Sequence, residues 1–407
     1  MLKNKSLVFF AVVFVSLFNL MCRVKAQEIP TSPPFDAWIS TDNNVFVLPS
    51  LERLGPSISL LRFGDSVRVI GCIPDCVSSN SWAQIYPQGI VRLSNLNTGP
   101  RTREAEFLGG YPDFTWAKVK RRGVVSRDNP SDHGSILERF SNGDELLFRT
   151  NILLQTQGYL ERPNGGFVPV ASLEIFEPST FSGWQNPPDN FVFVLNDTNI
   201  TLPNRQVLPV VRYQRFEAVS QNRTIATVSV VENERILSRR NTYVNGTIPR
   251  GDVRYGFKHN HPSTIPSGVR WVHVDLNQQV LTAYDYNDDL VFGTLVSTGR
   301  RRNSTHSGTF QVRRKITYTQ MRGGGSRPYN VEGVRWTQYL TELNEDVALH
   351  ESFWHSGFGR VRSHGCVNLS PADALYIFNF NPAQIPSGWR SIHPIALGIP
   401  NLWVIIE

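Results

Sequence analysis

The 407-residue sequence predicts a mainly β protein built from several small domains. Short runs of β-branched and aromatic residues recur between clusters of Gly, Pro and Asn, which is the pattern of small β barrels or sandwiches. The clearest runs are Val45–Leu48, Ser66–Ile70, Phe191–Leu195 and Ala226–Val231. Almost no stretch has the periodicity of a long amphipathic helix, and the length favours two to four domains.

The N-terminus has the features of an export signal. Lys3 and Lys5 form a short basic region, and Leu7–Leu20 is an apolar run too short to span a bilayer comfortably. Val24–Ala26 then offers small residues before a cleavage site. We expect a signal peptide at 1–26.

A lipoprotein anchored through Cys22 is the competing interpretation. Met21 stands where a small residue normally precedes a lipidated cysteine, which favours cleavage after Ala26. No later stretch is apolar enough to cross a membrane. We therefore expect a mature chain without a membrane span, exported to the cell envelope, in the periplasm or at the outer face of the cytoplasmic membrane.

Two stretches after the signal resemble bacterial SH3-like modules, and a third is weaker still. In the first stretch Phe63-Gly64-Asp65 precedes a strand, and Phe140–Asp144 repeats this pattern in the second. The expected division is a signal peptide and four domains: 1–26, 27–100, 101–182, 183–265 and 266–407. Such modules commonly bind wall peptides, but they can equally be spacers, and the fold does not decide between the two.

The four cysteines fall into two kinds. Cys72 and Cys76 flank a short turn, and without a second ligand pair they are expected to form a disulfide in an oxidising compartment. Cys22 leaves with the signal peptide. Cys366 is then an odd thiol in an exported protein, which makes it a candidate reactive group.

The formal charge of +7 suits a polyanionic environment such as a wall polymer. Basic residues are scattered along the chain, apart from Arg300–Arg302 and Arg313–Lys315, so the charge does not indicate nucleic-acid binding. These two clusters either form a solvated surface that keeps the protein soluble or attract substrate carboxylates.

The segment Arg362–Asn368 carries the clearest chemical signal. It reads Arg-Ser-His-Gly-Cys-Val-Asn, and His350 lies a short distance upstream. An imidazole can lower the pKa of a nearby thiol from its usual ~8.5, and backbone N–H groups can hold an oxyanion. The pattern predicts a cysteine acyltransferase.

The C-terminal third is similar to the L,D-transpeptidases of the YkuD family. The family signature, a histidine followed by Ser/Thr-His-Gly-Cys, matches His350 and Ser363–Cys366. Arg270–Tyr284 resembles the family's opening strands, which form a hairpin around an Asn-Gln turn, and Val296–Gly299 and Ser307–Phe310 match two further landmarks. The resemblance covers about 140 residues, from Pro266 to the C-terminus.

The resemblance implies a role for each signature residue. Cys366 would be the nucleophile, and His350 the general base, steered by a backbone carbonyl. His364 would shape the oxyanion pocket or orient substrate. The N–H groups of Gly365 and Cys366 would stabilise the tetrahedral intermediate, and a glycine at 365 allows substrate to approach the backbone closely.

Other positions are expected to hold substrate or support the loop. By the resemblance Asn368 secures the loop or a substrate carbonyl, Arg362 and Ser363 support it, and Trp354 either flanks the acyl donor or packs in the core. The family's mobile lid corresponds to Tyr318, Met321 and Gly323–Gly325. Glu351 departs from the Gly or Ser of relatives, and strand alternation favours a solvent-facing carboxylate.

Two local expectations complete the site. Ser370 caps a helix that begins at Pro371 and places the apolar residues Ala374, Leu375, Ile377 and Phe378 on one face, behind the nucleophile loop. A zinc centre of His350, His355, His364 and Cys366 is the rival interpretation, but the spacing does not fit a helical site. We expect no metal site and no cofactor.

The resemblance implies that the substrate is a peptidoglycan stem tetrapeptide. Cys366 would attack the carbonyl of the third residue, release the terminal D-alanine and form a thioester, which an amine of a neighbouring stem resolves into a cross-link. If water resolves the thioester, the protein is instead an L,D-carboxypeptidase. If a lysine of an envelope lipoprotein resolves it, the protein is an anchoring enzyme. Outside this chemistry, the sequence leaves open a wall-binding protein with an idle catalytic domain and a cysteine endopeptidase.

Overall fold

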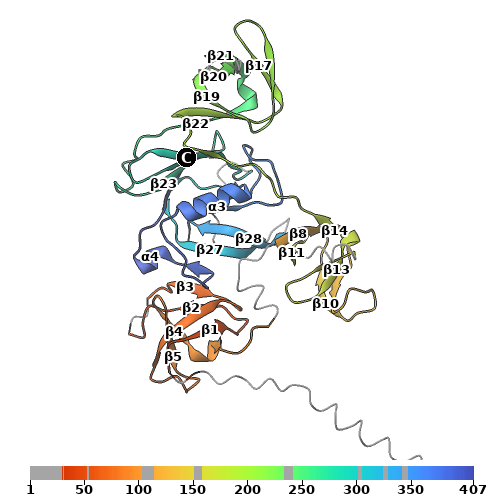
Figure 1. Cartoon of the computed structure of the whole chain (residues 1–407), viewed down its shortest axis with the longest axis vertical. Coiled ribbons are helices and arrows are strands. Elements are labelled where there is room, and N and C mark those ends of the chain that lie inside the picture. Colours follow the sequence, from red (N-terminus) through yellow and green to blue (C-terminus); the bar gives the residue numbers. More distant parts are fainter. Residues whose placement is uncertain are drawn as a thin grey trace, which may run out of the picture.

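The computed structural model describes residues 30, 32–52, 55–102, 114–150, 158–232, 242–300, 305–323, 329–341 and 347–407. Strands dominate these residues, and their two α-helices are α3 (Pro371–Phe380) and α4 (Pro394–Leu397) (Figure 1). The prediction of a mainly β fold is confirmed. The expected signal peptide at 1–26 lies outside the described residues. Within them, no helix has the length and apolarity needed to cross a membrane.

Three consecutive segments of the chain have the same order of elements: seven strands, with a 3-10 turn before the last. In the first segment these are β1 (Phe35–Ile39), β2 (Val45–Val47), β3 (Ser59–Leu61), β4 (Ser66–Ile73), β5 (Trp82–Ile85), β6 (Ile90–Arg92), the turn Leu93–Asn95 and β7 (Leu96–Asn97). In the second they are β8 (Phe114–Val119), β9 (Val124–Arg127), β10 (Ile136–Phe140), β11 (Glu145–Arg149), β12 (Tyr159–Glu161), β13 (Phe167–Pro169), the turn Val170–Ser172 and β14 (Leu173–Ile175). In the third they are β16 (Asn190–Val194), β17 (Thr198–Thr201), β18 (Val207–Val210), β19 (Arg215–Gln221), β20 (Ile225–Glu232), β21 (Thr242–Pro249), the turn Arg250–Asp252 and β22 (Val253–Phe257). We refer to them as repeats 1, 2 and 3.

The repeats also share strand pairings and a turn. The first strand of each pairs with the fourth and the last, and the second pairs with the third. Before the fourth strand, a residue with positive φ donates its N–H to the first strand or its end: Gly64 to Ile39, Gly143 to Val119 and Tyr213 to Val194. The third segment therefore shares its element order, strand pairings and turn with the first two.

The SH3-like identity of these repeats stays a prediction. Their described sheets do not close into barrels by hydrogen bonding, so the expected closed form is not what the structure contains. Repeat 3, for example, is an open seven-stranded sheet in the order β18-β17-β21-β20-β19-β16-β22.

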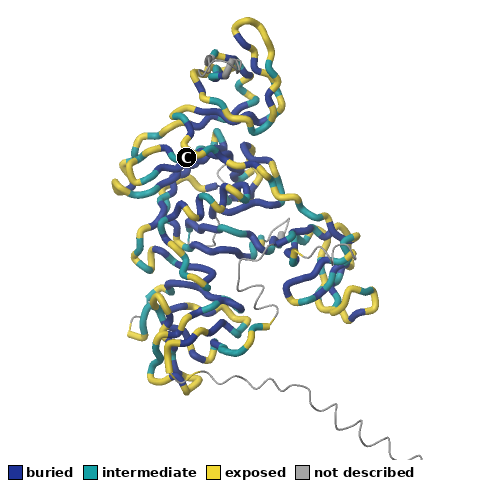
Figure 2. Tube along the Cα trace, in the orientation of Figure 1, coloured by how far each residue is buried: buried dark blue, intermediate teal, exposed yellow. Residues whose placement is uncertain are grey.

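The C-terminal region from residue 266 onward, predicted to be catalytic and called the catalytic region below, contains α3 and strands of two sheets. One strand of the first sheet, at 184–185, comes from the segment that precedes repeat 3. One sheet has the order β15-β25-β24-β23-β32-β26, with β15 (Trp184–Gln185), β23 (Trp271–Asp275), β24 (Val280–Tyr284), β25 (Leu290–Leu295), β26 (Gly308–Gln311) and β32 (Trp403–Ile406). The other contains β27 (Arg314–Gly323), β28 (Tyr329–Tyr339), β29 (Ala348–Glu351), β30 (Val367–Leu369) and β31 (Ser391–Ile392). Their strands are largely buried, whereas the outer loops of the repeats are exposed (Figure 2).

Two sequence-predicted elements of this region are confirmed. β23 and β24 pair as a hairpin, with Trp271 opposite Tyr284, around a turn that ends at Gln279. Ser370 caps α3 by accepting a hydrogen bond from the Asp373 N–H, with proline at the first helical position.

One detail of the α3 prediction is wrong. Ala374, Ile377 and Phe378 are buried, but Leu375 is 38% exposed, because it lies at the edge of the apolar stripe. The helix contacts β28, β29 and β30, and so lies behind the strands that carry the signature residues.

Repeat 1 shares its hydrophobic core with the catalytic region. Ala383, Trp389 and Ile392 pack within the same buried cluster as the strands of repeat 1. A buried ion pair joins the two parts, with 2.9 Å between Arg390 Nη2 and the Asp65 carboxylate. Repeat 1 is thus fixed to the catalytic region by both packing and charge.

Repeat 2 is joined to the catalytic region through a continuous sheet. The strand order β14-β8-β11-β28-β27-β31 passes from repeat 2 into the catalytic strands, and β11 pairs in parallel with β28 where Glu145 faces Val331. The sheet is visible in Figure 1, where β8 and β11 continue the line of β28. Repeat 2 therefore supplies strands to the sheet that contains the β27–β28 hairpin.

Candidate active site

The parallel pairing of β29 and β30 brings the two halves of the signature together. His350 on β29 lies opposite Asn368 on β30, and Cys366 directly precedes β30. The Cys366 side chain is half-buried and packs against a cluster of Ile316, Tyr339 and Ala348. Cys366 therefore lies immediately before the strand that pairs with the strand of His350, two residues before the position opposite His350.

The imidazole of His350 is buried and held by a single oriented hydrogen bond. Its Nδ1 lies 2.6 Å from the backbone carbonyl of Glu351. A carbonyl oxygen only accepts, so Nδ1 carries the proton and Nε2 presents a lone pair. Burial lowers the pKa of His350 to about 4, against the opposing effect of the carbonyl. The ring is neutral at pH 7 and can accept a proton at Nε2.

Ser363 organises the loop that carries Cys366. Its hydroxyl donates to the Cys366 carbonyl at 2.6 Å and accepts from the Gly365 N–H at 3.1 Å. The Gly365 N–H, expected to face the oxyanion, is directed at Ser363 instead, because the hydroxyl closes a tight turn around the glycine. His364 is exposed on this loop.

A polar framework beneath the loop was missed by sequence reasoning. Gln279 exchanges hydrogen bonds with Thr298, at 2.6 Å from Nε2 to the Thr298 hydroxyl and 2.8 Å from the Thr298 N–H to Oε1. The Thr298 carbonyl in turn accepts the N–H groups of Arg362 and Ser363, each at 2.9 Å. Gln279 and Thr298 lie in the hairpin turn and in the Ser-Thr-Gly landmark, whose residue types alone did not reveal that they meet.

Thr305 adds a second support to the same loop. Its hydroxyl donates to the Gly365 carbonyl at 2.7 Å and accepts from the Gly299 N–H at 2.8 Å. Thr305 is buried, so both hydrogen bonds are shielded from water. The backbone around Cys366 is thereby fixed on both sides.

Asn368 secures the strand that follows Cys366. Its backbone exchanges two hydrogen bonds with Ser297, at 2.9 and 3.0 Å, and its amide nitrogen lies 3.2 Å from His355 Nε2. Burial, with a further contribution from the charge of Arg362, lowers the pKa of His355 to about 4. The Arg362 side chain itself is exposed.

The aromatic and lid residues lie in a second cluster beside His350. The Trp354 ring is 5.9 Å from the His350 ring and meets Phe353 edge-on. Met321 packs both against this cluster and against the cluster that contains Cys366. Tyr318 is a buried member of the same cluster and packs against Phe114 of repeat 2. Of the expected lid residues, Gly324 and Gly325 lie outside the described residues.

The expectation that Glu351 faces solvent is wrong. Its side chain is fully buried and forms a bidentate ion pair with Arg335, with 2.9 Å between Oε1 and Nε and 3.0 Å between Oε2 and Nη2. Alternation fails here because all four residues of β29 are buried, so neither face of the strand meets solvent, and α3 packs against it. Burial raises the pKa of Glu351, and Arg335 opposes this effect.

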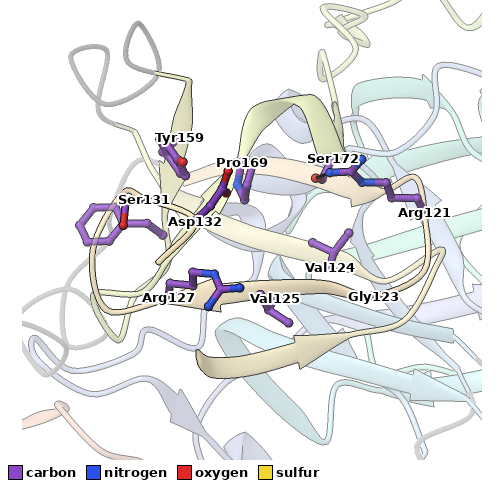
Figure 3. Close-up of a pocket in the computed structure, with 11 residues that line it drawn as sticks. Arg121, Gly123, Val124, Val125, Arg127, Ser131, Asp132, Tyr159, Pro169 and Ser172 are labelled. Atoms are coloured by element: carbon purple, nitrogen blue, oxygen red, sulfur yellow. Dashed lines mark hydrogen bonds between the residues drawn. The ribbon is translucent and has the colours of Figure 1, made fainter. Parts of the chain in front are cut away.

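The remaining predicted residues lie away from this site, in the repeats. Cys72 and Cys76 are joined by a disulfide in repeat 1. In repeat 2, a cavity of about 160 Å³ lies between β9 and the β12–β13 hairpin (Figure 3). Its wall includes two cations and an acid, Arg121, Arg127 and Asp132, together with the ring of Tyr159.

Comparison with known proteins agrees with the C-terminal resemblance. The model of the L,D-transpeptidase catalytic domain family, YkuD, matches residues 269–388. No curated protein matches the chain. Solved structures similar to it include the catalytic domain of the E. faecium L,D-transpeptidase, at 20% identity over 34% of this chain and 98% of that chain (TM-score 0.25). An L,D-transpeptidase from Mycobacterium smegmatis is 16% identical over 45% of this chain and 90% of that one (TM-score 0.27). An L,D-transpeptidase from Xylanimonas cellulosilytica is 22% identical over 36% of this chain and 65% of that chain (TM-score 0.24). Residues 269–388 of this chain therefore form a catalytic domain of the L,D-transpeptidase family.

Proposed function

We propose that this protein is a peptidoglycan L,D-transpeptidase that cross-links the third-position residues of two stem peptides through a thioester on Cys366. The observation that carries the proposal is the orientation of His350, whose Nδ1–H is held by the Glu351 carbonyl at 2.6 Å. This hydrogen bond leaves Nε2 as the proton acceptor on the strand next to Cys366.

The acylation half of the reaction begins with proton transfer. His350 Nε2 takes the thiol proton as the Cys366 sulfur attacks the carbonyl carbon of the donor's third residue. The tetrahedral intermediate collapses when the bond to the terminal D-alanine breaks, and its amine leaves with the proton from His350. By the family resemblance the Cys366 N–H is the proposed oxyanion donor, and the Gly365 N–H is bonded to Ser363.

The second half regenerates the thiol. The amine of an acceptor stem attacks the thioester carbonyl, and His350 removes a proton from this amine. Collapse forms the new amide bond, and the sulfur leaves and recovers the proton. Ser363, Thr298 and Thr305 fix the backbone of the nucleophile loop, so the sulfur and the imidazole keep their relative positions throughout.

Muropeptide analysis with purified protein tests this function directly. We expect wild-type protein incubated with tetrapeptide stems to release D-alanine and to yield dimers linked between third-position residues. Tripeptides without dimers would assign an L,D-carboxypeptidase, and product only with an added lipoprotein would assign an anchoring enzyme. Absence of D-alanine release with every acceptor would contradict the acyltransferase proposal.

The proposed place of action is the cell envelope, after export and removal of residues 1–26. L,D-transpeptidases act on peptidoglycan stem peptides, and the predicted export signal would bring this chain to that substrate. The division at 27–100, 101–182, 183–265 and 266–407 is part of the same proposal. Under it, the three repeats precede a single catalytic domain.

Wall-peptide binding by the repeats is a second candidate function. It is favoured by the cavity of repeat 2, whose Arg127, Asp132 and Tyr159 offer both charges and an aromatic ring to a short peptide. Sedimentation of the Cys366→Ala protein with purified wall tests this. We expect Tyr159→Ala in that background to reduce the bound fraction, and an unchanged fraction would leave the repeats as spacers.

A further inference from the structure

Two histidines and a carboxylate converge at a place remote in sequence from the signature residues. His259 follows β22 of repeat 3, His273 lies on β23, and Glu407 follows β32. Their donor atoms all lie within 4.8 Å of one another. Three separate parts of the fold therefore bring two imidazole nitrogens and one carboxylate oxygen together.

We propose that His259, His273 and Glu407 form a binding site for a divalent zinc ion. Two histidines and one glutamate are a common donor set for protein-bound zinc, and this set leaves a fourth position for water. Imidazole and carboxylate together suit zinc better than magnesium or calcium, which prefer sites made of oxygen atoms alone.

The backbones that carry the three donors are held in place. The Glu407 N–H donates to the Val274 carbonyl at 3.1 Å, and the Glu407 carbonyl accepts the Leu276 N–H at 2.7 Å. The His259 N–H donates to the Tyr284 hydroxyl at 2.8 Å. Because these positions are fixed by the fold, only side-chain rotation is needed to form the site.

The side-chain geometry shows what must move. His273 Nε2 lies 2.8 Å from Glu407 Oε1, so this nitrogen and oxygen already face each other, and zinc would replace the proton between them. The His259 ring lies close to the His273 ring, with centroids 3.7 Å apart and an angle of 34° between the ring planes. His259 is half-buried and must turn about its side-chain bonds to aim a nitrogen at the same point.

The site is open to solvent on the side of Glu407, whose side chain is 68% exposed, while His273 is buried at its floor. A metal ion could enter from that side. When bound, it would link the segment that leaves repeat 3 to two strands of the catalytic sheet. The expected role is to fix repeat 3 on the catalytic region, which departs from the sequence-based expectation of no metal site.

Zinc titration of the Cys366→Ala protein tests the proposal, because this background removes the thiol as a competing ligand. The protein is stripped with chelator and titrated with zinc sulfate by isothermal titration calorimetry. We expect one ion per chain, and at least tenfold weaker binding in His259→Ala and in Glu407→Gln. Both changes are made at partly exposed side chains, so the variants should fold, which circular dichroism checks.

His133→Ala serves as the matched control, because it removes an exposed histidine of repeat 2 and should leave zinc affinity unchanged. A second readout is thermal unfolding, in which zinc should raise the midpoint of the parent protein and not of His259→Ala. Absence of zinc binding by the parent protein, or binding that survives both ligand substitutions, would overturn the proposal. Neither readout depends on transpeptidase activity.

Discussion

The guanidinium of Arg335 lies over the indole of Trp116, with 4.6 Å from its central carbon to the ring centroid. Trp116 belongs to repeat 2 and Arg335 to β28. Arg335 also forms an ion pair with the buried carboxylate of Glu351. The backbone carbonyl of Glu351 orients His350. The indole of Trp116 also stacks on Phe353, at 4.4 Å between centroids. Repeat 2 thus shields an ion pair one residue away from the candidate base.

Glu351→Gln should destabilise the protein strongly. The change leaves the Arg335 cation, whose side chain is 24% exposed, without its buried counter-charge. Breaking a fully buried pair typically costs about 3 to 5 kcal/mol, and the partial exposure of Arg335 reduces this cost. Urea denaturation of the Cys366→Ala protein with and without Glu351→Gln measures the difference. Glu174→Gln, at an exposed position of repeat 2, is the control and should change the free energy of unfolding by less than about 0.5 kcal/mol. An equally small effect of Glu351→Gln would show that Arg335 does not depend on this carboxylate.

Cys366→Ala should abolish D-alanine release from tetrapeptide stems while the fold is retained. Cys366→Ser should keep at most a trace of activity, because an alcohol needs far stronger base assistance than a thiol. Release of D-alanine is measured by a coupled assay, and circular dichroism verifies the fold. Activity of the alanine variant at the wild-type level would remove Cys366 from the mechanism.

A carbapenem should acylate Cys366, since its strained carbonyl offers an activated thiol the same kind of electrophile as a stem-peptide bond. Mass spectrometry after incubation locates the adduct. His350→Ala should slow labelling at least a hundredfold, the usual contribution of a general base being about 10² to 10⁴. Labelling of a different peptide, or undiminished labelling in His350→Ala, would mean that the nucleophile or the base has been misassigned.

The acid limb of kcat/KM should lie well below the pH at which an ordinary histidine titrates. Burial lowers the pKa of His350 to about 4, so the ring stays neutral, and able to accept a proton, as pH falls through 6.5. Activity should therefore persist to about pH 5 and fail as pH approaches 4. D-alanine release from pH 3.5 to 8 measures this, with circular dichroism at each pH as a control for unfolding. A half-maximal rate at pH 6 to 7 would contradict a buried neutral base.

Lys315 should make stability rise with pH. Its ammonium group is buried over Phe378, and burial lowers its pKa to about 7. Between pH 7 and the unfolded pKa of about 10.4, the unfolded chain binds this proton and the folded chain does not, so raising the pH favours folding. Below about pH 7 both states bind the proton, and the contribution to the slope disappears.

Comparison of wild type with Lys315→Met isolates this effect. Between pH 8 and 9, the free energy of unfolding of wild type should gain about 1 kcal/mol relative to Lys315→Met. Lys120→Met, at an exposed position, controls for the loss of one positive charge. Parallel pH dependences of wild type and Lys315→Met would place the lysine in contact with water.

Local sequence rules predicted the parts of the site that are continuous in the chain. Ser370 and Pro371 indicated the start of a helix, and the β23–β24 hairpin, whose turn ends at Gln279, formed as expected. Contacts across the fold were beyond these rules. Glu351 was misplaced because alternation identifies a solvent face only where a strand has one, and Arg335 lies on a strand whose pairing with β29 the sequence did not reveal.

Recognition of the repeats from sequence was limited in a different way, because it depended on residue type. Phe140–Asp144 was found because glycine stands again at the position of positive φ, at Gly143 as at Gly64. In repeat 3 the equivalent position is Tyr213, with a φ of 72°. The backbone conformation is the same there, but the residue is not a glycine. The sequence alone therefore gave only a weak indication of the third repeat.

The pairing of β11 with β28 has a consequence for how this protein can change through evolution. An enzyme whose auxiliary segments are attached only by linkers can lose, duplicate or exchange them freely. Here the loss of repeat 2 would leave β28 without its partner at Glu145 and would uncover Phe353, which packs on Trp116. An uncovered strand edge promotes pairing with other chains. Repeat 2 and the catalytic domain are therefore bound to be inherited as a single unit.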